Sequence, residues 1–325
     1  MIWIELTAGL VLLLGGGEAL VRGSVSAASR LGVSKLLIGL TLVGFGTSTP
    51  ELVASLEAAL SGSPGVAAGN IVGSNIANIL LILGVSAALL PIATSRDAFR
   101  RDGTVLTAAT LLMVAVILGG EMGRLVGGIF LILLLGYTLF SYFSETRARD
   151  AAGDVYEAEA DEVAVPGMSL WAGLALAVAG IAGVIFGASL LVGSAIEIAR
   201  GAGLSEAVIG LTLVALGTSL PELVTSVMAA VRRHGDVAFG NIVGSNVFNI
   251  LGIAGTTALV SPFAVPPEIV RFDVWVMLAA TLLLVVFAIT GWRVSRREGA
   301  LFLLAYAAYI FVQLSPGARA ALGLS

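Results

Sequence analysis

The chain contains one segment twice. Residues 34–80 align with residues 205–251 without a gap, at an offset of 171 positions, and 29 of the 47 aligned positions are identical. The first copy reads IGLTLVGFGTSTPELVAS and then AGNIVGSNIANIL, and the second reads IGLTLVALGTSLPELVTS and then FGNIVGSNVFNIL. Because a repeat at a fixed offset means that one structural unit occurs again, each polar group of the motif is expected in a pair. The fold must therefore accommodate two related halves.

Both copies lie in strongly apolar surroundings. Hydrophobic residues fill 58% of the 325 positions and charged residues 12%, with a mean hydropathy of +1.04, which is outside the range of soluble domains. A helix needs about 20 apolar residues to cross a bilayer. Ten such stretches lie near residues 2–28, 36–60, 66–91, 103–119, 124–143, 167–199, 207–231, 237–260, 273–291 and 298–314. We predict an all-α membrane protein with ten transmembrane helices, and we take the first stretch as helix one because its start, MIWIE, lacks the basic segment of a signal peptide.

Five spans in each half imply that the halves start on opposite sides of the membrane and are inverted. Interrupted spans at matching positions of inverted repeats are typical of secondary transporters. We assign residues 1–143 to the first half, 144–166 to an acidic linker and 167–325 to the second half. Loops on one face hold twelve Arg and Lys residues and loops on the other face hold four, and basic loops stay in the cytoplasm. We therefore expect a multi-pass protein of the cell inner (plasma) membrane, with both termini outside and the linker in the cytoplasm.

A proline interrupts the second span and another interrupts the seventh. Pro50 has no N–H, so the carbonyl of Gly46 loses its usual helical partner and the carbonyl of Thr47 is loosened, and Pro221 stands at the equivalent place. Free carbonyls at membrane depth are tolerated only where they are buried in protein or line a wet cavity. The two broken helices are therefore expected to supply oxygen ligands to one central site.

A glutamate directly follows each proline. Glu51 and Glu222 lie near the positive end of the half-helix that begins there, where a carboxylate is favoured. An ionisable side chain deep in a span is costly and indicates an ion or proton pathway. The S-x-x-E spacing from Ser48 and from Ser219 also fits a capping box, which would explain each glutamate without a ligand. We interpret both glutamates as ligands, with capping as a secondary role.

The GNIVGSN motif adds a polar stripe. Residues four apart lie on one helix face, here Asn70, Ser74 and Asn78 in the first copy and Asn241, Ser245 and Asn249 in the second. The glycines between them are typical of closely packed membrane helices, and we interpret them so. We expect ion ligation from Ser74, Asn78, Ser245 and Asn249.

All of these donors are oxygen atoms. The chain has no cysteine and its single histidine, His234, stands in a short loop beside arginines, so hard cations such as Na⁺, Ca²⁺ and Mg²⁺ are favoured over zinc or copper. Two glutamates and two freed carbonyls already provide about six of the six to eight oxygens that Ca²⁺ takes. One Ca²⁺ or two Na⁺ would neutralise the two carboxylates. No intramembrane His, Lys or Asp accompanies the serines, which argues against a hydrolase, and a channel would not explain two inverted broken helices.

GTSTPELVAS with GNIVGSN, repeated as GTSLPELVTS with GNIVGSN, resembles the paired alpha-repeats of the cation/Ca²⁺ exchanger superfamily, specifically its prokaryotic sodium/calcium exchangers. The resemblance covers the whole ten-span layout. It implies a secondary active antiporter, not an enzyme, that exchanges Na⁺ for Ca²⁺ by alternating access while helices one and six slide across the core. It implies no cofactor and no nucleic-acid partner. Lipid, Na⁺ and Ca²⁺ are the expected partners, and the layout is compatible with a monomer.

The resemblance also implies a ligand set. The carboxylates of Glu51 and Glu222 would bridge the ions, and Thr47 and Thr218 would give main-chain oxygens to Ca²⁺. Asn78 and Asn249 would line the middle position. The sodium sites would be completed by Ser48, Ser74, Ser219 and Ser245, with backbone oxygens from Gly44 and Ala215.

The chain departs from some relatives by carrying amides at both Asn78 and Asn249, where those relatives have one aspartate. With only two carboxylates, occupancy of the middle position should depend less on pH. A Ca²⁺/H⁺ antiporter of the same fold is the nearest alternative, although such relatives typically have Asn in place of the Thr-Ser before the glutamate. A K⁺-dependent exchanger is a further alternative, for which an aspartate would be expected at Asn249.

Overall fold

The structure is a computed structural model that describes residues 2–32, 45–94, 96, 99–148, 163, 165–231 and 235–324. Gly44, His234 and most of the predicted linker lie outside these residues. The first half contains α1 (Ile2–Arg30), α3 (Thr49–Leu60), α4 (Pro64–Ile76), the π-helical turn η2 (Ala77–Leu83), α5 (Gly84–Leu89), β1 (Ile92–Ala93), η3 (Phe99–Gly103), α7 (Thr104–Leu118), β2 (Glu121–Met122) and α8 (Arg124–Ala148). The second half contains α10 (Leu170–Ala202), α11 (Glu206–Ile209), η4 (Gly210–Val214), α12 (Ala215–Thr218), α13 (Leu220–Val231), α14 (Gly235–Val247), η5 (Phe248–Ile253), α15 (Ala254–Val260), β3 (Phe263–Ala264), η6 (Ile269–Asp273), α16 (Val274–Ile289), β4 (Arg293–Val294), α17 (Arg296–Leu314) and α18 (Pro316–Ala321).

The described residues include eight helical spans that are long and apolar enough to cross a membrane. A ninth is formed if the bent pair Glu206–Thr218 and Leu220–Val231, which meet at 48°, counts as one span. These nine fall on nine of the ten predicted stretches. Of the predicted span 36–60, the structure describes residues 45–60, which hold α3. The described part of the chain is thus almost entirely helical, with about eight apolar spans.

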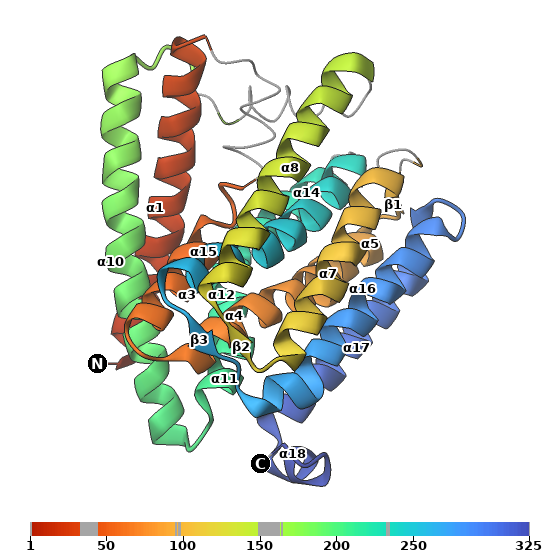
Figure 1. Cartoon of the computed structure of the whole chain (residues 1–325). Coiled ribbons are helices and arrows are strands. Elements are labelled where there is room, and N and C mark those ends of the chain that lie inside the picture. Colours follow the sequence, from red (N-terminus) through yellow and green to blue (C-terminus); the bar gives the residue numbers. More distant parts are fainter. Residues whose placement is uncertain are drawn as a thin grey trace.

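The helices α1 and α10 form an antiparallel pair at one edge of the molecule (Figure 1). A glycine recurs every seventh residue on each helix, at positions 9, 16 and 23 of α1 and at positions 173, 180 and 187 of α10. A Cβ atom built on Gly16 would lie 2.6 Å from the backbone nitrogen of Val184 and 2.9 Å from the Gly180 carbonyl oxygen. Only glycine allows two helices to approach this closely, so the two form one tightly packed unit.

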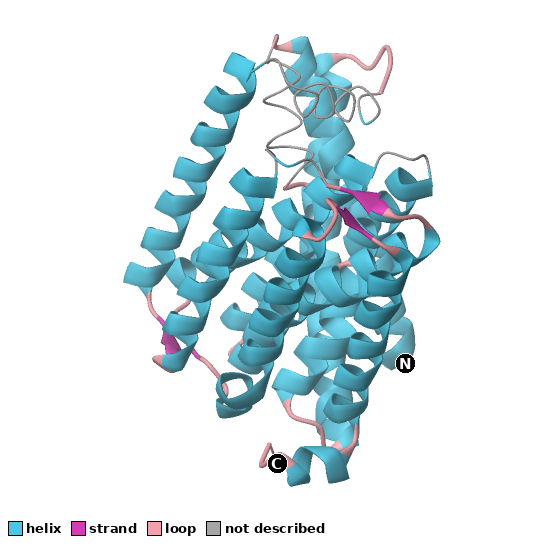
Figure 2. Cartoon of the chain, turned by 90° about the vertical axis from the view of Figure 1, so that its right-hand side faces the viewer, coloured by secondary structure: helices cyan, strands magenta, loops and turns pink. Residues whose placement is uncertain are grey.

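Two short antiparallel strand pairs lie at opposite ends of the helical bundle (Figure 2). At one end Ile92 of β1 pairs with Val294 of β4, and at the other end Met122 of β2 pairs with Phe263 of β3. Each pair therefore joins one half of the chain to the other. In the middle of α7 and of α16, the hydroxyls of Thr110 and Thr281 lie 3.4 Å apart. These two residues are separated by the same offset of 171 positions as the two copies of the repeat.

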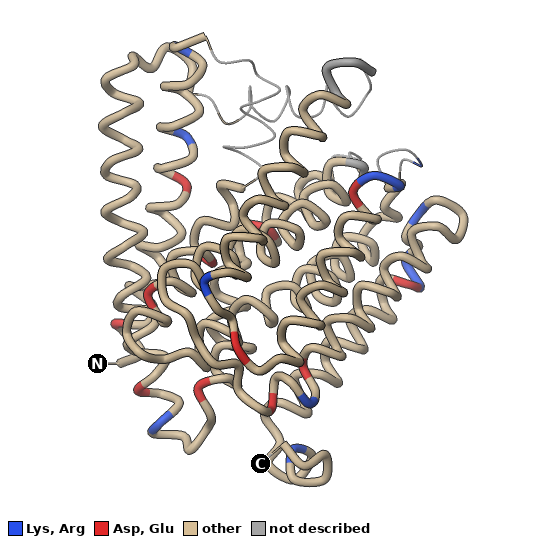
Figure 3. The backbone as a smooth tube through the Cα atoms, viewed as in Figure 1, with Lys and Arg blue, Asp and Glu red and all other residues tan. Residues whose placement is uncertain are grey.

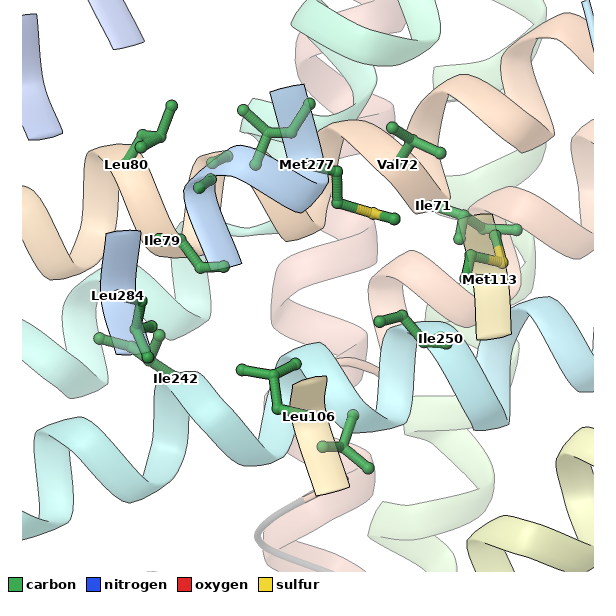
Figure 4. Packing of buried hydrophobic residues seen from close by; sticks show 14 of the residues in the cluster. Ile71, Val72, Ile79, Leu80, Leu106, Met113, Ile242, Ile250, Met277 and Leu284 are labelled. Carbon is green, nitrogen blue, oxygen red and sulfur yellow. The ribbon is translucent and has the colours of Figure 1, made fainter. Parts of the chain in front are cut away.

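The main apolar core lies between the repeat helices and the helices that follow them. Side chains of α4 and η2 interleave with those of α14 and η5, and α7 and α16 cover them (Figure 4). Ile79, Leu106, Ile242 and Leu284 are completely buried there. Most of the backbone carries neither acidic nor basic residues, and the charged positions concentrate toward the helix ends, with a few acidic ones inside the bundle (Figure 3). The rigid core thus surrounds the polar motif.

Candidate functional site

The two motif carboxylates are buried and reach across the halves. Glu51, in the first turn of α3, is 1% exposed, and Glu222, in the first turn of α13, is 0% exposed. The Ser48 hydroxyl donates to Glu222 Oε1 at 2.6 Å, and the Ser219 hydroxyl donates to Glu51 Oε1 at 2.8 Å. The serine at the proline-interrupted segment of each half therefore donates a hydrogen bond to the glutamate of the other half. These two bonds bring four predicted site residues together.

The capping role expected for the first of these glutamates, Glu51, is wrong for the described structure. Ser48 occupies the N-cap position of α3, but its side chain makes no capping hydrogen bond. Its hydroxyl is already committed to Glu222 across the site. The Ser48 hydroxyl thus serves a contact between the halves and makes no contact to the end of its own helix.

Of the two carbonyls that Pro50 was expected to affect, the Gly46 carbonyl finds a new partner, and the Thr47 carbonyl accepts no backbone hydrogen bond from the described residues. The N–H of Thr49 donates to the Gly46 carbonyl at 3.1 Å, so Gly46 has a partner, and the N–H of Leu52 donates to the Ser48 carbonyl at 3.1 Å. Neither bond involves the Thr47 carbonyl. A tight three-residue turn thus compensates the loss at Pro50 and leaves the oxygen of Thr47 as the available backbone ligand.

In the second half, the helix α12 brings Thr218 and Ala215 to the break. The Ala215 carbonyl accepts from the N–H of Ser219 at 3.1 Å and from the Thr218 hydroxyl at 3.3 Å. The N–H of Leu223 donates to the Ser219 carbonyl at 3.1 Å. Of the predicted backbone ligands, Ala215 is therefore engaged within its own helix in this state, and Gly44, its counterpart, lies outside the described residues.

Many polar atoms of the predicted ligands are buried without a hydrogen-bond partner. Such atoms are rare in native proteins unless a ligand, ion or water satisfies them. Fourteen occur among the described side chains, and nine of them belong to predicted ligands. They are Thr47 Oγ1, Glu51 Oε2, Ser74 Oγ, Asn78 Oδ1 and Nδ2, Glu222 Oε2, Ser245 Oγ, and Asn249 Oδ1 and Nδ2. Seven are oxygen atoms, contributed by both halves, and hard cations prefer oxygen donors.

The π-helical turns carry the two asparagines into the interior. Asn78 lies in η2 and Asn249 in η5, and both side chains are fully buried. The turn η2 contacts α13 and α14, whereas η5 contacts α3 and α4. Each asparagine therefore sits on a turn that packs against the helix holding the other half's glutamate. Wide turns of this kind occur frequently at functional sites, and the hydropathy pattern gave no signal for them.

Two serines and two asparagines outside the predicted ligand set also shape the site. Asn70 Nδ2 donates to the Ser55 hydroxyl at 2.9 Å and to the Glu51 carbonyl at 3.1 Å. Asn241 Nδ2 donates to the Ser226 hydroxyl at 3.0 Å. The identity of Ser55 and Ser226 between the two aligned copies was the signal that could have singled them out.

Comparison with known proteins places the chain in a family. The model of the family described as sodium/calcium exchanger protein matches residues 1–143 and 172–315. The chain belongs to this family. It is 36% identical over 341 residues to the sodium/calcium exchanger MaX1 of Methanosarcina acetivorans, covering 95% of this chain and 97% of that protein. It is also 36% identical to the putative antiporter CaxA of Alkalimonas amylolytica over 320 residues, covering 96% and 98%.

The fold agrees with solved structures of one exchanger. A structure of the sodium-calcium exchanger NCX_Mj soaked with Na⁺ and Sr²⁺ superposes with a TM-score of 0.62 at 31% sequence identity, covering 95% of this chain and 97% of that one. Within the described residues no group of three or more His, Cys, Asp or Glu residues could hold a metal ion. The donors gathered here are two carboxylates surrounded by hydroxyls, amides and backbone oxygens, a set suited to hard cations.

Proposed function

We propose that this member of the sodium/calcium exchanger family is a secondary active antiporter that exchanges Na⁺ for Ca²⁺ across the cell inner membrane. The observation that carries the proposal is the set of seven buried, unpaired oxygen atoms contributed by both halves. Such oxygens are stabilised when a hard cation binds among them. The names of the relatives MaX1 and NCX_Mj, both sodium/calcium exchangers, support the same assignment.

In this proposal the ions bind between two inverted five-helix halves. The equal offset between Glu51 and Glu222 and between Thr110 and Thr281 supports a repeat. The strand pairs β1–β4 and β2–β3, which join the halves at opposite ends of the bundle, support its inversion. The carboxylates of both glutamates bridge the ions, and Thr47 and Thr218 give main-chain oxygens to Ca²⁺. Asn78 and Asn249 line the middle position, and both termini lie outside with the linker in the cytoplasm. The remaining sodium ligands are Ser48, Ser74, Ser219, Ser245 and the backbone oxygens of Gly44 and Ala215.

The close-packed pair of α1 and α10 supplies the moving part of the proposed cycle. Glycine contacts lock these two helices to each other. Among the described elements, α1 packs against α3 and α12, and α10 packs against α3, α11 and η4. A pair that is rigid within can slide over such a surface as one body, which is the shear type of motion. This sliding would open the central site to the two sides in turn.

The proposal is tested by Ca²⁺ uptake into sealed vesicles loaded with Na⁺. Uptake should follow the outward Na⁺ gradient and fall to the level of protein-free vesicles in Glu51→Gln and in Glu222→Gln, because each change removes a charge from the site. Glu57→Gln is the matched control, since Glu57 lies on α3 as well but contacts the exposed Ser61 hydroxyl at 3.3 Å. Uptake driven equally well by a proton gradient without Na⁺ would refute Na⁺ coupling and favour the Ca²⁺/H⁺ alternative.

A further inference from the structure

In each half, the two parts of the repeated motif form a pair of helices joined by a short connection. The helix α3 ends at Leu60 and α4 begins at Pro64, and α13 ends at Val231 and α14 begins at Gly235. The helix α3 packs against α4, and α13 packs against α14. Because helices with so short a connection lie antiparallel, a step back along the first helix and a step forward along the second lead in the same direction.

A hydrogen bond between an asparagine and a serine joins the two helices of each pair. Asn70 Nδ2 on α4 donates to the Ser55 hydroxyl on α3 at 2.9 Å. Asn241 Nδ2 on α14 donates to the Ser226 hydroxyl on α13 at 3.0 Å. Both serines are completely buried. These two bonds, the hairpin bonds, are related by the same offset of 171 positions as the repeat, and each lies within a single half.

The hairpin bond of the first half lies one helical turn from a proposed ligand on both helices. Ser55 follows Glu51 by four residues, so the two share one face of α3. Asn70 precedes Ser74 by four residues and shares one face of α4 with it. Because the helices are antiparallel, Glu51 and Ser74 both lie one turn, about 6 Å, from the bond in the same direction. Asn70 Nδ2 also donates to the Glu51 carbonyl at 3.1 Å.

The second half repeats this arrangement. Ser226 follows Glu222 by four residues, and Asn241 precedes Ser245 by four residues. In both halves the glutamate and the ligand serine each have one buried oxygen without a hydrogen-bond partner among the described residues. The distance between these oxygens depends on how far apart the two helices lie, and the hairpin bond restrains that separation one turn away.

We propose that the Ser55–Asn70 and Ser226–Asn241 pairs set the width of the cation site and thereby its preference for Ca²⁺ over the larger cation Sr²⁺. The four side chains are positioning residues and not ion ligands, because the hydroxyl and the amide of each pair bind each other. The inference rests on the proposed exchange of Na⁺ for Ca²⁺ and assigns the size selectivity of that same site.

The physical reason is the stiffness of the oxygen cage. Selection between divalent cations of different size depends on the size of the cavity, the number of ligands and their flexibility. Ca²⁺ takes its oxygens at about 2.3–2.6 Å, and a larger cation needs them farther apart. Spreading the helices of one hairpin strains a buried hydrogen bond, so the hairpin bond makes the larger cation costlier to hold. The pair is neutral and leaves the charge of the site unchanged.

The size preference is measured with the full-length protein in sealed vesicles loaded with Na⁺. Initial rates of Ca²⁺ uptake and of Sr²⁺ uptake are recorded at increasing cation concentration, which gives kcat/KM for each cation. The ratio of the two values does not depend on the amount of folded protein, because both come from the same vesicles. The unmodified protein should have a ratio above one. A ratio of one would overturn the proposal, since a restrained cage must discriminate by size.

Removal of either serine hydroxyl should weaken this preference. Ser55→Ala and Ser226→Ala should each lower the ratio by at least about twofold, the smaller effect of losing one buried hydrogen bond. Ser86→Ala is the matched control, because Ser86 on α5 is also completely buried and its hydroxyl has no hydrogen-bond partner among the described residues. Its ratio should stay at the unmodified value. If Ser55→Ala and Ser226→Ala slow both uptakes equally, or if the control lowers the ratio as much, the proposal is overturned.

A double variant tests whether serine and asparagine act together. Asn241→Ala should lower the ratio, and Ser226→Ala combined with Asn241→Ala should lower it no further than Ser226→Ala alone, because one bond can be lost only once. Additive losses would overturn the pairing. Absence of Na⁺-driven uptake of both cations by the unmodified chain would refute the proposed function. Na⁺-driven uptake with the same ratio in every variant would refute the positioning role alone.

Discussion

The packing of α1 against α10 leads to a sharp prediction at two adjacent glycines. Gly16 faces α10, where a Cβ atom would lie 2.6 Å from the Val184 nitrogen and 2.8 Å from the Gly183 carbonyl carbon. Non-bonded heavy atoms meet favourably near 3.5 Å, so Gly16→Ala must separate the backbones by about 1 Å. Gly15 is exposed, and a Cβ atom there would meet nothing within 4 Å. Gly15→Ala is therefore an ideal control.

The expected loss of stability follows from comparing the free energies of unfolding of Gly15→Ala and Gly16→Ala. Replacing a helical glycine by alanine stabilises a helix by about 1 kcal/mol, and this gain is common to both changes and cancels. What remains is the overpacking cost at Gly16, about 1–3 kcal/mol. Thermal unfolding of the purified protein in detergent, followed by circular dichroism, should rank Gly15→Ala at or above the unmodified chain and Gly16→Ala clearly below Gly15→Ala. If the two variants unfold at the same temperature, the close approach of α1 and α10 is refuted.

Three further outcomes are expected. Ser48→Ala removes the 2.6 Å hydrogen bond to Glu222 and should lower Ca²⁺ uptake at limiting Ca²⁺ about tenfold, as expected for a bond to a charged group; Ser61→Ala on the exposed end of α3 should not. Asn249→Asp adds a third carboxylate and should make uptake vary with pH across roughly pH 5 to 8, where the unmodified chain varies less. Tyr309→Phe removes the 3.0 Å hydrogen bond to the buried Asp273 and should lower stability by about 1–3 kcal/mol in thermal unfolding, with a smaller loss in Tyr306→Phe.

Composition and repetition predicted most of the fold because both are local properties of the chain. Eight of the ten apolar stretches coincide with helical spans in the described residues, and a ninth does so if the bent pair Glu206–Thr218 and Leu220–Val231 counts as one span, since each needs only enough apolar residues to cross a bilayer. The glycine repeat at positions 9, 16 and 23 was also present in the sequence. The sequence did not show which helix packs against these glycines, because the choice of α10 as neighbour depends on the tertiary arrangement of the halves.

The sequence predicted which residues form the site but not which of them contact each other. The spacing from Ser48 to Glu51 fits a local cap, and only the distance between the halves decides that the serine binds Glu222 instead. In the same way, the glycines interpreted as packing residues do pack at positions 69 and 73, whereas positions 240 and 244 meet no described neighbour.

The buried carboxylates explain why the proposed cycle would exchange ions and not leak them. Glu51 and Glu222 are sealed from solvent, and each receives one serine hydrogen bond while its second oxygen has no partner. Each uncompensated buried charge costs several kcal/mol, so an empty site with both carboxylates ionised would cross between states rarely. In the proposed cycle, one Ca²⁺ or two Na⁺ would remove that cost. Coupling would then need no separate recognition of ion identity, since either load would neutralise the same two charges.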